Sequence, residues 1–145
     1  MIRVHGTSVS IGGEGILLRG PSGCGKSDLA LRLVDEGARL VADDQTEISR
    51  RDSSLEMTAP AALAGLLEVR GLGIVRVSHM ARAPLRLVVD LVPSDAVERM
   101  PEPTFCTIEG VSLPLLALDA FAASAPAKLR LALKALVPAG AAAAP

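Results

Sequence analysis

The segment of residues 20–27 limits what this chain can fold into more than any other. Its sequence, Gly-Pro-Ser-Gly-Cys-Gly-Lys-Ser, matches the phosphate-binding pattern G-x-x-x-x-G-K-[ST], known as Walker A. The glycines allow successive backbone N–H groups to turn toward one anion. Lys26 would place a positive charge near the outer phosphates of a nucleotide, and the Ser27 hydroxyl could ligate a bridging magnesium ion. The predicted nucleotide-binding residues are Gly20, Pro21, Ser22, Gly23, Cys24, Gly25, Lys26 and Ser27.

The segments on both sides fit such a loop. Residues 15–19 form a short apolar run that predicts a strand, and residues 28–36 have helical periodicity with apolar side chains on one face. The N-terminus of that helix would attract phosphate through its dipole. Residues 39–42 predict the next strand. Strand, helix and strand at this spacing form a βαβ unit, whose strands are expected to be parallel, with ligand sites at their carboxyl ends.

The remaining segments predict an α/β fold. Residues 2–11 predict two short strands with a turn near Gly6, and residues 12–15 a tight hairpin connection. We expect hairpins over residues 45–57 and 106–116, a strand over 85–92, a loop over 93–103, and a helix over 118–136 with a break at Ala125-Pro126. Residues 1–137 are therefore predicted to be one P-loop domain with a mixed, partly parallel sheet. Residues 138–145 contain only Ala, Gly and Pro, and are predicted to be a disordered tail.

Composition narrows the class of protein. A chain of 145 residues, half of them apolar, is long enough to bury one core. A net charge of −1 gives no general attraction to nucleic acid, and two Phe without Trp or Tyr leave little for stacking its bases. No apolar run approaches the length of a membrane span, and the N-terminus lacks the form of a signal peptide. With two isolated thiols, the chain is predicted to be cytoplasmic, with no membrane or nucleic-acid partner.

Two acidic residues, Asp43 and Asp44, follow the strand predicted over residues 39–42. One carboxylate there could ligate magnesium as a Walker B residue does, and the other could accept a proton from an attacking hydroxyl. Because successive side chains of a strand point to opposite faces, we expect different roles for the two. The alternative is a pair of solvated turn acids. His5, in the first strand, could assist acid–base chemistry or contact phosphate, with a purely structural histidine as the alternative.

The segment Glu68-Val69-Arg70-Gly71-Leu72-Gly73 is unusual. Its two glycines would allow a ligand to approach the backbone closely. Glu68 could complete a metal shell, and Arg70 could bind phosphate in a bidentate manner. A glycine-rich turn with a surface ion pair is the alternative, and composition alone does not decide between the two.

Four blocks, in order, resemble the catalytic, C-terminal domain of the HPr kinase/phosphorylase family. They are His5-Gly6, residues 20–27, Leu40-Val41-Ala42-Asp43-Asp44, and the segment of residues 67–74. The separation of Ser27 and Asp44, 44 − 27 = 17 residues, also resembles the family's. A phosphate loop alone is common, whereas V-A-D-D at this distance followed by E-V-R-G-L-G is far more specific. The resemblance covers roughly residues 2–100 and fades after that.

The resemblance implies a protein-serine kinase that uses ATP and magnesium to phosphorylate the carrier protein HPr. In the family the same site can remove that phosphate by attack of inorganic phosphate, which releases pyrophosphate. It further implies a homo-oligomer, since the family is hexameric, and a fold similar to the nucleotide domain of phosphoenolpyruvate carboxykinase. The predicted catalytic residues are His5, Lys26, Asp44 and Arg99, the predicted metal ligands are Ser27, Asp43 and Glu68, and Arg70 and Gly71 are candidate phosphate or substrate contacts.

The chain departs from the family's common form in three ways. It begins directly at the catalytic domain, as does the short proteobacterial form that lacks the N-terminal domain, and its segment 74–92 is shorter than usual. The family's late P-x-x-P-G-R-N loop, which the family links to dephosphorylation, is not found around residues 113–116. We therefore expect kinase activity with weakened or lost phosphorylase activity. Two other functions stay open: a nucleotide-binding sensor module, and a small-molecule P-loop kinase or ATPase.

Overall fold

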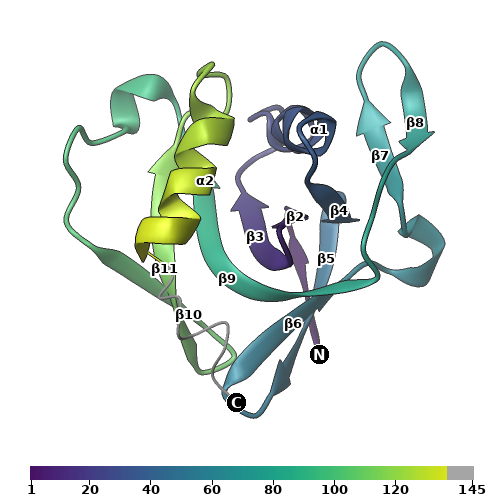
Figure 1. Cartoon of the computed structure of the whole chain (residues 1–145), viewed down its shortest axis with the longest axis horizontal. Coiled ribbons are helices and arrows are strands. Elements are labelled where there is room, and N and C mark those ends of the chain that lie inside the picture. Colours follow the sequence, from purple (N-terminus) through teal and green to yellow (C-terminus); the bar gives the residue numbers. More distant parts are fainter. Residues whose placement is uncertain (137–145) are drawn as a thin grey trace.

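The computed structural model describes residues 1–136, and the predicted tail of residues 138–145 lies outside this range (Figure 1). Two helices and eleven strands make up the described part. The helices are α1 (Lys26–Asp35) and α2 (Ala125–Leu136), with short 3-10 helices at Ala61–Leu63 and Ser94–Ala96. The strands are β1 (Ile2–His5), β2 (Thr7–Ile11), β3 (Glu14–Arg19), β4 (Arg39–Ala42), β5 (Gln45–Arg51), β6 (Ser54–Thr58), β7 (Leu66–Val69), β8 (Gly73–Arg76), β9 (Arg82–Leu91), β10 (Thr104–Ile108) and β11 (Val111–Leu118).

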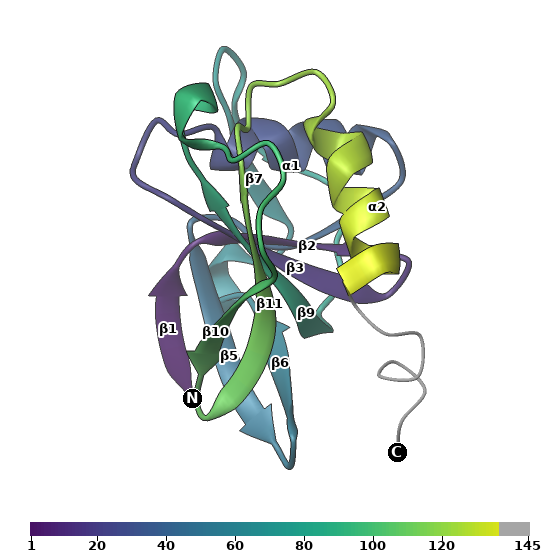
Figure 2. The same ribbon diagram turned by 90° about the vertical axis from the view of Figure 1, so that its left-hand side faces the viewer.

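Nine strands form one curled, mixed sheet. Seven of them follow the order β1-β5-β6-β9-β3-β2-β4, and the β10–β11 hairpin joins the sheet through pairing of β11 with β9. β7 and β8 form a separate hairpin. The long strand β9 connects the halves of the sheet. Its first residues pair with β6 in antiparallel fashion, and its later residues pair in parallel with β3 on one edge and β11 on the other. Gly15 is required where β3 meets β9, because a Cβ there would overlap the carbonyl oxygen of Pro84. Figure 2 shows β1, β5 and β6 extending away from the two helices.

The predicted βαβ unit forms with one difference. β3 and β4 run in the same direction, as expected, but β2 lies between them and is antiparallel to both. The hairpin predicted over residues 45–57 is confirmed as β5–β6, which turns at residues 52–53, and the hairpin around Gly110 is confirmed as β10–β11. The carboxyl ends of β3 and β4 therefore lie at the same edge of the sheet, with the amino end of β2 between them.

The helix predicted over residues 118–136 is wrong in its first part. β11 extends to Leu118, which pairs with Leu91 of β9, and residues 119–124 form turns. α2 begins only at Ala125, with Pro126 in its first turn, where the missing N–H of proline costs no helical hydrogen bond. The proline thus marks the start of this helix and not a break within it.

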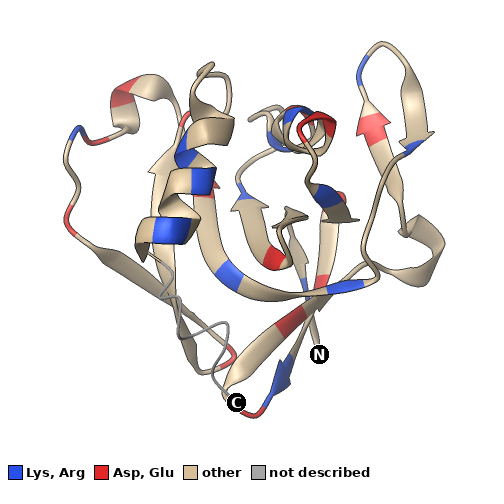
Figure 3. Cartoon of the chain, in the orientation of Figure 1, with Lys and Arg blue, Asp and Glu red and all other residues tan. Residues whose placement is uncertain are grey.

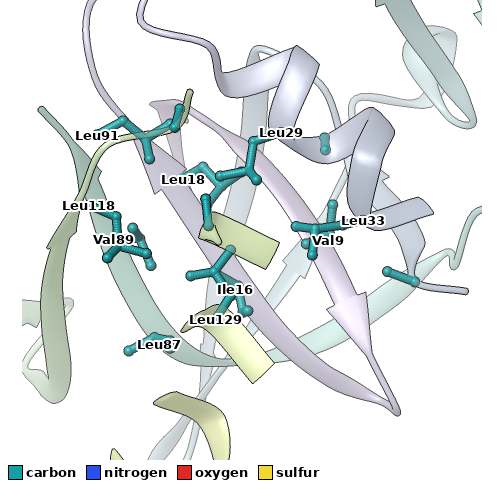
Figure 4. Close-up of a cluster of buried hydrophobic side chains, with 14 of the residues drawn as sticks. Val9, Ile16, Leu18, Leu29, Leu33, Leu87, Val89, Leu91, Leu118 and Leu129 are labelled. Atoms are coloured by element: carbon teal, nitrogen blue, oxygen red, sulfur yellow. The ribbon is translucent and has the colours of Figure 1, made fainter. Parts of the chain in front are cut away.

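The hydrophobic core lies on both faces of the central strands. One cluster fills the space between the helices and the sheet (Figure 4). The second cluster lies on the opposite face and includes Leu17 of β3 and Val88 of β9. Because side chains alternate along a strand, Ile16 and Leu18 belong to the first cluster and Leu17 to the second. The labelled residues of the first cluster are Val9, Ile16, Leu18, Leu29, Leu33, Leu87, Val89, Leu91, Leu118 and Leu129.

Charged residues lie outside this core, and one pair of them connects the two helices. Figure 3 shows acidic and basic residues interspersed over the ribbon, whereas α2 carries only basic bands. Glu36, at the end of α1, accepts a hydrogen bond from Arg130 of α2 at 2.5 Å. No helix in residues 1–136 is long and apolar enough to cross a membrane.

Candidate active site

The phosphate loop joins the end of β3 to the start of α1. Gly25 is the N-cap of α1 and has left-handed backbone angles, with φ of 96°, which glycine adopts without strain. Just before the loop, Arg19 of β3 makes a bidentate ion pair with Asp90 of β9, at 2.8 and 3.2 Å. The hydrogen bond to Asp90 raises the pKa of Arg19. β9 therefore fixes the point from which the loop departs.

Lys26 lies inside the loop that precedes it. Only 7% of the residue is exposed. Its ammonium group donates hydrogen bonds to the carbonyl oxygens of Gly20 at 2.7 Å and Pro21 at 3.1 Å. The positive charge is thus held within the loop, where a bound phosphate would contact both the ammonium group and the N-terminus of α1.

Asp43 connects three separate elements through its carboxylate. Its Oδ1 accepts hydrogen bonds from the Ser27 hydroxyl of α1 at 2.7 Å and from the Thr7 hydroxyl of β2 at 3.0 Å. Its Oδ2 accepts a hydrogen bond from the backbone N–H of Glu68 in β7 at 3.0 Å. This carboxylate therefore fixes the phosphate-loop serine relative to the strand ends.

Asp44 points to different partners from those of Asp43. Its Oδ1 lies 2.7 Å from Nε2 of His5, and both side chains are about half exposed, at 62% and 48%. The separation of the two aspartates does not come from strand alternation, because β4 ends at Ala42. Asp44 instead has a left-handed backbone, with φ of 67°, and its N–H donates to the Thr7 hydroxyl at 3.1 Å. Thr7 thus contacts both aspartates.

A pocket of about 660 Å³ opens beside the phosphate loop. The β7–β8 hairpin contributes Glu68, Arg70 and Gly71 to its wall, and the turn before α2 contributes Phe121. In Figure 1 α1 lies between α2 and this hairpin. The pocket thus brings together residues from four distant parts of the chain. Those predicted from the sequence are Ser22, Gly23, Gly25, Lys26, Ser27, Asp44, Glu68, Arg70 and Gly71.

Other predicted residues lie outside the pocket wall. His5 contacts the pocket residue Asp44, and Asp43 contacts the pocket residues Ser27 and Glu68 through hydrogen bonds. Arg99 is exposed, does not line the pocket, and makes no side-chain hydrogen bond or ion pair with the described residues. Thr7 and Phe121 were not predicted from the sequence. Thr7 directly follows the His5-Gly6 block, which could have drawn attention to it, whereas no local pattern marks Phe121.

The oxygen ligands near Ser27 fit magnesium better than a softer metal. No group of three or more His, Cys, Asp or Glu side chains within residues 1–136 is arranged to hold a metal ion by itself. Magnesium is usually bound by one or two carboxylates, waters and the phosphates of a substrate. The Ser27 hydroxyl and the Asp43 carboxylate provide such a partial set, 2.7 Å apart at the start of α1.

The fold and the site together define an α/β P-loop domain with a curled, mixed sheet, of the kind found in kinases. The chain belongs to the family of HPr serine kinase C-terminal domains, whose family model matches residues 1–119. The chain thus shares this family's catalytic-domain sequence over most of its length.

Named relatives agree with the family. The chain is 46% identical over 78 residues to the HPr kinase/phosphorylase of Clostridium kluyveri, which covers 54% of this chain and 25% of that protein. It is 51% identical over 78 residues to that of Limosilactobacillus reuteri, covering 53% of this chain and 24% of that protein. The chain therefore spans about a quarter of the length of these relatives.

A solved structure shares the fold. The HPr(Ser) kinase/phosphatase from Coxiella burnetii superposes with a TM-score of 0.80, over 92% of this chain and 95% of that chain, at 24% sequence identity. This match confirms the predicted α/β fold with a mixed sheet.

Proposed function

We propose that this chain is a protein-serine kinase that uses ATP and magnesium to phosphorylate an HPr-like carrier protein. The observation that carries the proposal is a pocket that joins a phosphate loop to Asp44, with the Asp43 carboxylate bonded to the loop behind the pocket wall. Asp43 bonds to the loop serine at 2.7 Å, and Asp44 lies at the pocket wall. The names of the relatives support the choice of HPr as the acceptor.

The first set of residues would hold the triphosphate and its metal. Lys26 and the N-terminus of α1 attract the phosphates, and Ser27 with Asp43 would hold magnesium, with Glu68 nearby in the pocket. When bound, the metal would neutralise charge that develops on the transferred phosphoryl group. Arg70, which lines the pocket from the β7–β8 hairpin, is proposed to contact a phosphate. We assign Arg99 no role within this pocket.

Asp44 is proposed to be the general base. A neutral serine hydroxyl is a poor nucleophile, so a carboxylate must orient it and accept its proton. Asp44 is suited to a protein acceptor because its side chain is 62% exposed. Its Oδ1 pairs with His5, which would orient the carboxylate and leave Oδ2 to accept the proton of an incoming hydroxyl. Asp43 is less suited to this role, because three donors share its two oxygens and one of them is the phosphate-loop serine.

Composition and the family resemblance support the remaining parts of the proposal. We place the kinase in the cytoplasm, as a homo-oligomer, without nucleic-acid or membrane partners. We also propose weakened or lost phosphorylase activity. Residues 113–116, where the family's P-G-R loop would be sought, lie instead in β11, paired with β10 and β9.

A labelled-ATP assay with HPr and magnesium tests the proposal. Wild-type enzyme is expected to transfer label to one serine of HPr. Asp44→Ala should lower transfer by about 100-fold or more, the usual range for removal of a general base, while ATP binding is retained. Lys26→Ala should weaken both ATP binding and transfer.

The same assay separates the two alternatives. A nucleotide sensor would bind ATP but label no acceptor, and Asp44→Ala would leave its binding and signalling intact. A small-molecule kinase would consume ATP with a metabolite and leave HPr unlabelled. Either outcome would contradict the proposed protein-kinase function.

A further inference from the structure

Phe121 is an aromatic side chain exposed at the edge of the pocket. It is one of only two aromatic residues in the whole sequence, and 64% of it is exposed to solvent. It lies in the turn between β11 and α2 and lines the pocket together with the phosphate loop. This turn follows the last residue matched by the family model, residue 119, so family membership assigns Phe121 no role.

Hydrogen bonds fix the backbone at Phe121 and at the residues before and after it. The Asp119 carboxylate accepts a hydrogen bond from the Phe121 N–H at 2.9 Å. The Arg32 guanidinium donates to the carbonyl oxygens of Ala120 and Ala122, the residues on either side. Because Arg32 belongs to α1, which begins at the phosphate loop, the turn and the loop are held in one fixed arrangement.

The ring also touches the loop directly. A Cβ built on Gly25 would lie 3.0 Å from Cζ and 3.1 Å from Cε1 of Phe121. One edge of the ring therefore lies against the N-cap of α1, while Phe121 remains 64% exposed and lines the pocket. An exposed aromatic residue held this firmly beside an anion site differs from one that is exposed at random on a surface.

A nucleotide bound by its phosphates still needs a place for its base. Aromatic side chains hold bases by stacking, and this stacking tolerates any base because every base has a π-face. Phe121 is the aromatic residue in the wall of this pocket. We propose that Phe121 is the platform on which the base of the bound nucleotide stacks. This inference rests on the proposed nucleotide-dependent function.

The proposal has a consequence for base selectivity. A phenyl ring offers no hydrogen-bond donor or acceptor to distinguish adenine from guanine. The chain also contains no Asn, and so lacks the N-K-x-D motif that reads guanine in Ras-type GTPases. Phe121→Ala should therefore weaken the binding of ATP and GTP by similar factors.

Calorimetric titration of the full chain with magnesium tests the proposal. ATP reports base and phosphates together, whereas inorganic tripolyphosphate reports the phosphate loop alone. Phe121→Ala is expected to raise the Kd for ATP about 10-fold, within the range measured for loss of one base–aromatic stack, and to leave the Kd for tripolyphosphate unchanged. Phe121→Tyr, which keeps the aromatic face, should bind both ligands as wild type does.

Phe105→Ala is the matched control, because Phe105 is equally exposed, at 62%, but lines a different cavity. It should bind both ligands as wild type does. The proposal is overturned if Phe121→Ala binds ATP normally, or if it loses ATP and tripolyphosphate equally, since the ring would then only shape the loop. If the wild-type chain binds tripolyphosphate as tightly as ATP, the stacking proposal is refuted, whereas the proposed phosphate-binding function is not. Failure to bind either ligand would refute the proposed function as well.

Discussion

The Ser27 hydroxyl donates a hydrogen bond to Asp43 at 2.7 Å, across a separation of 16 residues. This bond links the first turn of α1 to the end of β4. The same carboxylate accepts two further hydrogen bonds, from Thr7 and from the Glu68 N–H. The carboxylate thus has a structural role that can be tested apart from catalysis.

Asp43→Asn should destabilise the fold as well as reduce activity. The amide has only one acceptor oxygen, so at least one of the donors from Ser27, Thr7 and Glu68 loses its partner. The bonds from Ser27 and Thr7 are part-buried and the bond from the Glu68 N–H is exposed, so losing one of them should cost about 1 kcal/mol of the free energy of unfolding, the net contribution of a typical hydrogen bond. Urea denaturation measures this loss. Asp44→Asn is the control, because that side chain is 62% exposed, and its effect should stay within about 0.5 kcal/mol. Equal losses for both variants would contradict the assigned role of Asp43.

Thr7→Val should lower kcat more than it changes the KM for ATP. Thr7 is fully buried, and its hydroxyl both donates to Asp43 and accepts from the Asp44 N–H. Valine has nearly the same shape but makes neither bond, so the left-handed turn at Asp44 loses its support. Steady-state kinetics with HPr would show the difference, and Thr7→Ser should restore kcat. If Thr7→Val keeps full kcat, the hydroxyl does not position the catalytic carboxylate.

Leu129→Ala should cost about 2–5 kcal/mol of the free energy of unfolding, the usual range for a buried leucine. Leu129 is fully buried in the cluster between α2 and the sheet. Leu131 of the same helix is 65% exposed, and Leu131→Ala should change stability by less than about 0.5 kcal/mol. Thermal or urea unfolding gives both values. Similar losses at the two positions would mean that α2 does not pack as described.

The Cys106 thiol should react slowly with alkylating reagents in the folded protein. Burial raises the pKa of Cys106, so less thiolate, the reactive form, is present at a given pH. In a Cys24→Ala background, the alkylation rate should reach half its maximum at a higher pH in the folded chain than in the unfolded one. Because the folded pKa is the higher one, the stability contributed by the neutral thiol is complete below the unfolded-state pKa and is lost as pH rises through the folded pKa. A folded chain that is alkylated as fast as a urea-unfolded one would contradict this.

Phosphorylated HPr should be a poor substrate for the reverse reaction. We expect little pyrophosphate when it is incubated with the enzyme and millimolar phosphate, because the segment at residues 113–116 is an ordinary strand. The kinase assay at the same enzyme concentration is the control. Rapid release of pyrophosphate would show that the P-G-R loop is dispensable.

Local patterns predicted the parts of the fold whose causes are local. The phosphate loop, α1 and the hairpins at Asp52 and Gly110 follow from glycines, turn residues and periodicity over a few positions. The insertion of β2 between β3 and β4 did not follow, because pairing between distant strands depends on the whole sheet. The prediction that the last helix begins at residue 118 was wrong for the same reason. Leu118 pairs with Leu91 of β9, and this tertiary contact outweighs helical propensity.

Local patterns also predicted only part of the candidate site. Lys26, Asp44 and Glu68 belong to recognisable motifs and line the pocket. Phe121 has no motif, and its position depends on Arg32, which is 89 residues earlier in the chain (121 − 32). Thr7 acts through a hydroxyl that reaches Asp43 and Asp44 only after β2 and β4 have paired.

The central position of β9 has a consequence for how the chain folds. Leu17 of β3 is paired with Val88, so closing this contact requires a loop of 71 residues (88 − 17). Closing a long loop costs conformational entropy before the strand contacts that stabilise it have formed. This cost slows the folding of sheets with distant strand partners. A ribosome-bound chain that ends before residue 82 lacks β9. Arg19, just before the phosphate loop, would then lack its ion pair with Asp90. We therefore expect nucleotide affinity to be acquired late, after β9 has been synthesised, rather than with the motif itself.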